Sequence, residues 1–148
     1  MARTLAAIIT AGTLVLSAIV PAAARGPDVN YALFCLGCHT SKGVSAPLGR
    51  IPPLKGAVGH LALLPEGRRY IVNVPGVLNS GLGAEDTAAL LNWMVATYGE
   101  ASTPADFAPF TAAEVARWRA AAPDDVMVLR AEVRARLAER GISLDPYP

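Results

Sequence analysis

The chain has 148 residues, which is enough for one domain of ordinary size. Its 13 basic and 12 acidic side chains give a formal net charge of +1. The sequence also has no basic stripe that would neutralise phosphates, so it does not predict binding to nucleic acid. Hydrophobic residues make up 53% of the chain, and part of this high fraction lies in residues 1–24.

Residues 1–24 have the layout of a secretory signal peptide. A basic start with Arg3 precedes an uncharged apolar run over residues 5–20, and Pro21 and a small-residue cleavage signature at residues 22–24 follow. The apolar run is short for a membrane span of about 20 residues, which favours cleavage over a retained anchor. We therefore expect export to the periplasm and no stable membrane span after cleavage.

The two cysteines of the chain both lie in one motif, Cys-Leu-Gly-Cys-His at residues 35–39. Cys-x-x-Cys-His is the attachment signature of c-type haem. The two thiols add to the two vinyl groups of the porphyrin as thioethers, and the adjacent histidine becomes the proximal iron ligand. The motif therefore predicts one covalent haem c held by Cys35, Cys38 and His39.

Three other interpretations compete for the same cysteines. A redox pair of the thioredoxin type needs a strand before it and a βαβ context, whereas the flanks here predict helices. A zinc site needs more ligands than His39 and His60 supply. A disulfide between Cys35 and Cys38 would close a very small loop and add little stability. The adjacent histidine and the export signal favour haem.

The residues around the motif resemble the small single-haem c-type cytochromes of the class I-like family. Residues 30–34 are similar to the end of the family's N-terminal helix, and Pro-Pro-Leu-Lys-Gly at residues 52–56 is similar to its Pro-x-Leu-x-Gly segment. The resemblance implies that the Pro52 carbonyl accepts a hydrogen bond from Nδ1–H of His39. A ligating histidine needs such an acceptor to fix its ring and tautomer.

A long helix is predicted to begin near Ala84 and to stop at Gly99. Acidic residues occupy its first turn, and Leu90, Trp93 and Met94 recur at helical spacing. It is similar to the last helix of the family's haem domain, so the resemblance covers roughly residues 28–98 and implies an all-α fold.

The ligand on the far side of the iron is where the sequence departs from the family. The common pattern has a methionine in the loop before the last helix, but residues 74–82 contain none. Met94 is the candidate distal ligand, with core packing as the competing interpretation. Three further hypotheses are ligation by Met127, ligation by His60, and an iron whose sixth position is open or holds water.

The C-terminal part predicts two amphipathic helices after a linker at residues 101–110. A capping box is predicted at Thr111 and Glu114, where the first of the two helices begins. The second helix is predicted to end at Gly141; it has apolar residues on one side and arginines, including Arg130, on the rest. We expect this extension, residues 111–148, to cap the haem domain, residues 25–100, with docking to a dehydrogenase as the competing hypothesis.

A further helix is predicted at residues 65–72, ending before Pro75. Arg68 and Arg69 on it could bind haem propionates through their guanidinium groups, but a solvated surface pair is the favoured interpretation.

Together these features predict a periplasmic one-electron carrier rather than an enzyme. It would accept an electron from a periplasmic dehydrogenase and pass it to a terminal oxidase or another cytochrome. An open sixth iron position would instead favour a peroxidase or gas sensor. A haem subunit of a larger oxidoreductase is the third hypothesis.

Overall fold

The computed structural model describes residues 25–45 and 51–144, so the expected signal peptide lies outside the described residues. Within these ranges the chain forms helices and no strand, which confirms the all-α class. The helices in chain order are α1 (Pro27–Phe34), α2 (Leu36–His39), α3 (Val58–Ala62), α4 (Pro65–Asn73), α5 (Pro75–Leu78), α6 (Ala84–Tyr98), the 3-10 helix η1 (Glu100–Ser102), α7 (Ala112–Ala120) and α8 (Val126–Ala138).

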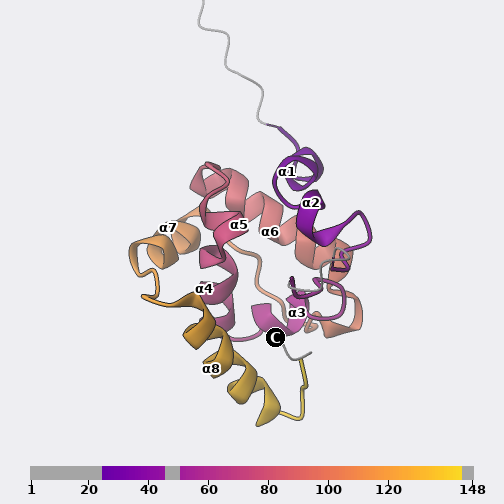
Figure 1. Ribbon diagram of the computed structural model, residues 1–148, viewed down its shortest axis with the longest axis vertical. Helices are drawn as coiled ribbons and strands as arrows, with labels where there is room; N and C mark the ends of the chain where they lie inside the picture. Colours follow the sequence, from indigo (N-terminus) through magenta and orange to yellow (C-terminus); the bar gives the residue numbers. More distant parts are fainter. Residues whose placement is uncertain (1–24, 46–50, 145–148) are drawn as a thin grey trace, which may run out of the picture.

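Helix α6 is the centre of the packing, and it contacts α1, α3 and α7 (Figure 1). Its observed bounds confirm the predicted helix, which begins after Gly83 and has Glu85 and Asp86 in the first turn. Leu90, Leu91 and Val95 are fully buried in the hydrophobic core. The longest helix of the described chain therefore provides the surface on which the N-terminal and C-terminal segments are both arranged.

Prolines set the starts of α4 and α5. Pro65 and Pro75 each lie in the first turn of their helix, where a missing N–H costs no hydrogen bond. The sequence predicted that the helix containing Arg68 would end before Pro75, and α4 does end at Asn73. The chain then turns at Val74 and starts the short helix α5, which the sequence analysis did not predict.

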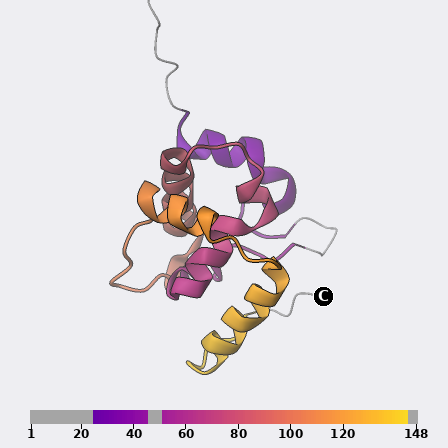
Figure 2. The same ribbon diagram turned by 90° about the vertical axis from the view of Figure 1, so that its left-hand side faces the viewer.

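The two C-terminal helices pack on the rest of the described chain. Helix α7 contacts α4 and α6, and α8 contacts α4 and extends away from the other helices (Figure 2). Leu129, Val133 and Leu137 form the buried side of α8, as their spacing predicted. The expectation that Arg130 lies on the outer side is wrong, because Arg130 is buried with its guanidinium carbon 5.8 Å from the centre of the Tyr70 ring.

A largely buried ion pair joins α4 to α7. Arg68 donates through Nε and Nη2 to the two carboxylate oxygens of Glu114, each at 2.6 Å. The side chains are only 12% and 14% exposed, and the guanidinium also lies 3.8 Å from the centre of the Phe110 ring. The interpretation of Arg68 as a solvated surface residue is therefore wrong, because a carboxylate from a later helix covers it.

The same pair explains the cap of α7. The Thr111 hydroxyl accepts a hydrogen bond from the Glu114 amide at 3.1 Å, which is the first half of the predicted capping box. The second half is absent, because the Glu114 carboxylate is used by Arg68 and also accepts from the Trp118 indole at 3.2 Å.

No helix within the described ranges is both long enough and apolar enough to cross a membrane.

Candidate haem site

The Cys-x-x-Cys-His motif occupies a single helical turn. Cys35 ends α1 and precedes α2, and His39 is the last residue of α2, with its amide donating to the Cys35 carbonyl at 2.9 Å. Residues three and four apart on a helix share one side. The turn therefore brings Cys35, Cys38 and His39 to one side of the chain, as attachment of one porphyrin requires.

An aromatic cluster holds this turn against α6. The rings of Tyr31, Trp93 and Tyr98 lie 5.2 to 5.7 Å apart, centre to centre, across the contact between α1 and α6. The Tyr31 hydroxyl donates to the Thr40 carbonyl at 2.7 Å, just beyond the motif. The sequence analysis did not assign this role, although the helical spacing of Trp93 was a usable signal.

The segment after the motif passes directly beneath Tyr98. Gly43 has a φ of +67°, and a Cβ added there would lie 2.5 Å from a carbon of the Tyr98 ring. Both the backbone conformation and the close approach therefore require glycine. The Gly43 carbonyl in turn accepts from the amides of Leu54 and Lys55, at 2.8 and 3.0 Å, and the Gly56 amide donates to the Tyr98 carbonyl at 3.0 Å.

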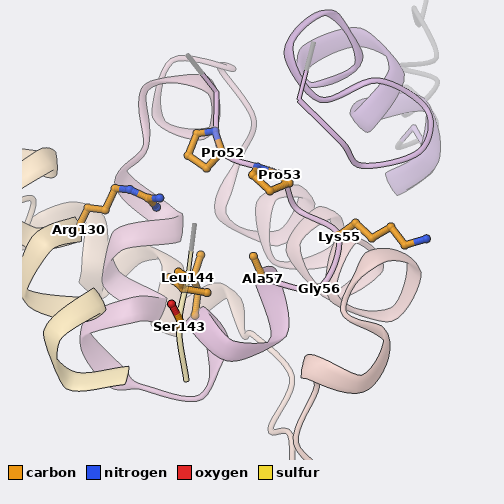
Figure 3. A pocket seen from close by; sticks show the side chains of 9 residues that line it. Pro52, Pro53, Lys55, Gly56, Ala57, Arg130, Ser143 and Leu144 are labelled. Carbon is orange, nitrogen blue, oxygen red and sulfur yellow. The ribbon is translucent and has the colours of Figure 1, made fainter. Parts of the chain in front are cut away.

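These bonds place the Pro52–Pro53 segment beside the motif. Figure 3 shows Pro52 and Pro53 at the edge of a cavity of about 170 Å³, with Arg130 and Leu144 from the C-terminal part on its other sides. A haem is much larger than this cavity, so the cavity is not the haem site. It shows that the C-terminal part of the chain reaches the segment that faces His39.

The His39 imidazole has the Pro52 carbonyl as a neighbour, as a metal-binding histidine requires of a hydrogen-bond acceptor. Burial lowers the pKa of the imidazole, and the Pro52 carbonyl acts in the opposite direction. A lowered pKa keeps the imidazole neutral, which is the form that binds a metal. The Nδ1 atom is buried without a hydrogen bond of good geometry, so Pro52 is its neighbour but the bond is not closed.

The oxidation state and the pKa of the two cysteines bear on the competing interpretations of the motif. Both cysteines are free, with Cys35 buried and Cys38 exposed, so no disulfide joins them in the structure. Burial, and secondarily the nearby Cys38, raises the pKa of Cys35 to about 11. A redox pair of the thioredoxin type needs a lowered thiol pKa. The described residues also contain no group of three His, Cys, Asp or Glu side chains that could hold a zinc ion.

Large apolar side chains near the motif and across from it are exposed. Leu33 on α1 is 58% exposed, Leu78 on α5 is 41% exposed, and Leu36 is exposed beside Cys35. Phe34 is partly buried against the core, as expected for the end of the N-terminal helix. Exposed leucines around two free thiols and a buried, unbonded imidazole nitrogen fit an apolar ring bound at this position.

The candidate distal ligands are spread over three helices. Met94 is 3% exposed and belongs to the core cluster on α6, whereas Met127 is exposed at the start of α8. His60 lies half-buried in α3, which follows the proline segment.

A helical domain with Cys-x-x-Cys-His on one turn and a proline segment beside the histidine defines the class of c-type cytochromes. No protein-family model matches the chain. A cytochrome c-552 from Thermus thermophilus is 36% identical over 138 residues, which cover 81% of this chain and 88% of the relative. A second cytochrome c-552 from Thermus thermophilus is 35% identical over 104 residues, which cover 58% of this chain and 79% of the relative. The chain belongs to the cytochrome c-552 family of small c-type cytochromes. Its cofactor is covalently bound haem c, and its class is that of electron carriers.

Proposed function

We propose that Cys35 and Cys38 form the two thioethers of one haem c and that His39 is its proximal iron ligand. The observation that carries this proposal is the single helical turn that presents two free thiols and the His39 imidazole together. Each thiol adds across one vinyl double bond, so a sulfur–carbon bond forms and the thiol hydrogen passes to the other vinyl carbon. No atom leaves and the addition is not an oxidation.

Pro52 positions His39. Its carbonyl is the hydrogen-bond acceptor that acts on the pKa of the imidazole, and proline has no backbone N–H that would compete for that position. A hydrogen bond from Nδ1–H to this carbonyl would fix the tautomer that leaves Nε2 for the iron. The hydrogen bonds of Leu54 and Lys55 to Gly43 hold the carbonyl in place.

When bound, the haem supplies a one-electron couple, and the surrounding residues bury it and set its potential. The buried Cys35 and the aromatic cluster exclude water from one edge of the site. Cys38 is exposed, so a haem edge attached to it would lie at the surface, where a partner could approach. The function that follows is transfer of single electrons between proteins.

The chain acts in the periplasm, after removal of residues 1–24, between a dehydrogenase and a terminal oxidase or another cytochrome. The export layout of the N-terminal sequence and the covalent attachment motif support this placement. Loss of one electron by the reduced dehydrogenase cofactor matches gain of one electron by the ferric haem, so no further oxidant is needed.

The test is a potentiometric titration of holoprotein matured in an exporting host, followed by rapid mixing with the dehydrogenase that co-purifies with it. We expect a one-electron Nernst curve and reduction at least as fast as dehydrogenase turnover. As a control, Lys55→Gln removes an exposed cation that pairs with Glu100 but keeps the backbone amide that donates to Gly43, so it should leave haem attachment and the one-electron curve unchanged. Reduction slower than turnover, with the haem correctly attached, would remove the carrier role.

A further inference from the structure

The side chain that could bind the sixth position of the iron is missing from the part of the fold across from the motif. Haem iron in proteins is bound by His, Met, Cys or Tyr side chains. Figure 1 shows α2 and α5 on either side of the near surface of α6, and the exposed Leu36 and Leu78 lie on these two helices. His39 is the last residue of α2, so α5 and the following turn lie across this surface of α6 from the proposed proximal ligand.

Residues 74–82, which form α5 and this turn, carry none of those ligands. Their side chains are Val, Pro, Gly, Leu, Asn and Ser. Asn79 is exposed, and the Ser80 hydroxyl is already used, because it donates to the Val77 carbonyl at 2.8 Å and accepts from the Leu82 amide at 3.3 Å.

The segment is also held in place from outside. Arg119 of α7 donates to the Leu82 carbonyl at 3.0 Å and to the Thr87 hydroxyl at 2.9 Å. The Thr87 hydroxyl itself donates to the Gly83 carbonyl at 2.7 Å. One guanidinium therefore ties the turn to the start of α6.

Within the described residues, the potential ligand side chains of other elements are packed or bonded; Tyr70 of α4 is buried beside Arg130, and Tyr147 lies outside the described residues. Met94 is packed in the core on α6, a helix fixed by contacts with α1, α3 and α7. Met127 lies on α8, which contacts α4. His60 is half-buried on α3, which follows the proline segment. Tyr31 and Tyr98 point their hydroxyls at the Thr40 and Ser41 carbonyls.

We infer that the sixth position of the iron is open to a small exogenous ligand such as carbon monoxide or nitric oxide, beside the α5 segment that carries the exposed Leu78. This inference rests on the proposed attachment of haem at Cys35, Cys38 and His39. It adds a binding site for uncharged diatomic molecules to the electron-transfer site, and the exposed leucine of α5 is apolar, which suits such ligands.

The test uses holoprotein whose thioether-linked haem has first been shown by mass. We expect the ferrous protein to bind one carbon monoxide per haem at neutral pH and the ferric protein to lack the far-red charge-transfer band of Met-ligated haem. Met94→Leu, which keeps the volume but removes the sulfur, should leave both observations unchanged. Leu78→Met should create the band and markedly weaken carbon monoxide binding, because it supplies a thioether from α5.

Each other outcome overturns the inference. A far-red band in the wild type that disappears in Met94→Leu would make Met94 the ligand. Refusal of carbon monoxide without that band would mean that a nitrogen ligand, such as His60, fills the position, and His60→Ala would then restore binding. Attached haem with either result leaves the proposed attachment intact, whereas absence of attached haem would remove both proposals.

Discussion

Two regions of the molecule differ in how complete their interiors are. Around α4, α7 and α8, apolar residues such as Val115, Val133 and Leu137 are fully buried, and the buried Arg68 at the α4–α7 contact has its carboxylate. Around α1, α2 and α5, Leu33, Leu36 and Leu78 are exposed and the buried His39 Nδ1 has no hydrogen bond. The buried side chains of the first region pack on one another, although Met127 and Val128 of α8 are exposed there, whereas the second region presents its exposed leucines beside the two free thiols.

The difference shows that the stability of a small domain can come partly from packing between its own side chains and partly from burial against a bound cofactor. Apolar burial contributes about 25 cal/mol for each Å² removed from water. The helices of the C-terminal region gain this from each other. Under the proposed attachment, those of the N-terminal region would gain it when the ring covers the exposed leucines, which would couple haem binding to folding there.

The largest expected effect comes from removing both thiols. The double variant Cys35→Ser, Cys38→Ser should contain no covalent haem, because serine hydroxyls do not add to the vinyl groups. Intact-protein mass measures this loss directly. The haem-free variant should keep the far-UV circular dichroism of haem-free wild type, and loss of helix content in the variant alone would contradict the view that the cysteines serve attachment.

The next largest effect is expected at the buried ion pair. Arg68→Leu should lower the free energy of unfolding by about 3 kcal/mol, because it leaves the Glu114 carboxylate buried without its partner. Urea unfolding of the haem-loaded and haem-free forms measures the change. Replacing both residues by leucine should cost less than the single change. A double variant as unstable as the single one would show that Glu114 is not the group left unpaired.

A matched pair of leucines tests the comparison itself. Leu137→Ala should cost about 2 to 4 kcal/mol in both haem-loaded and haem-free forms, because its fully buried side chain would leave a cavity. Leu33→Ala should cost less than about 0.5 kcal/mol in the haem-free form, where the side chain is exposed, and more when haem covers it. Equal costs for Leu33→Ala in the two forms would remove Leu33 from the haem contact.

The smallest expected effect is a change in the pH dependence of stability. The hydrogen bonds from Arg68 lower the pKa of Glu114 below its usual value. The folded state thus favours the ionised carboxylate, whose stabilisation is complete above the ordinary glutamate range and is lost as the pH falls below it. The stability difference between wild type and Glu114→Gln should therefore narrow in acid. A difference that stays constant between neutral and acid pH would contradict this account.

Much of this molecule could be predicted from local patterns, and the failures have one cause. The helix at Ala84–Tyr98 and the buried side of α8 were predicted because helical spacing reports which side faces inward. Arg68 and Arg130 were misjudged because their burial depends on residues far along the chain, such as Glu114. The motif at residues 35–39 was found because its chemistry fixes its spacing, whereas the contact between Gly43 and Tyr98 depends on packing that spacing does not encode.

The most direct test of the central claim is the intact mass of the mature protein expressed in a host that attaches haem c, combined with its spectrum in alkaline pyridine. The account predicts a mass increased by one haem and the spectrum of a porphyrin with both vinyl groups saturated. A mass without haem, lowered instead by two hydrogens through a bond between Cys35 and Cys38, would contradict it.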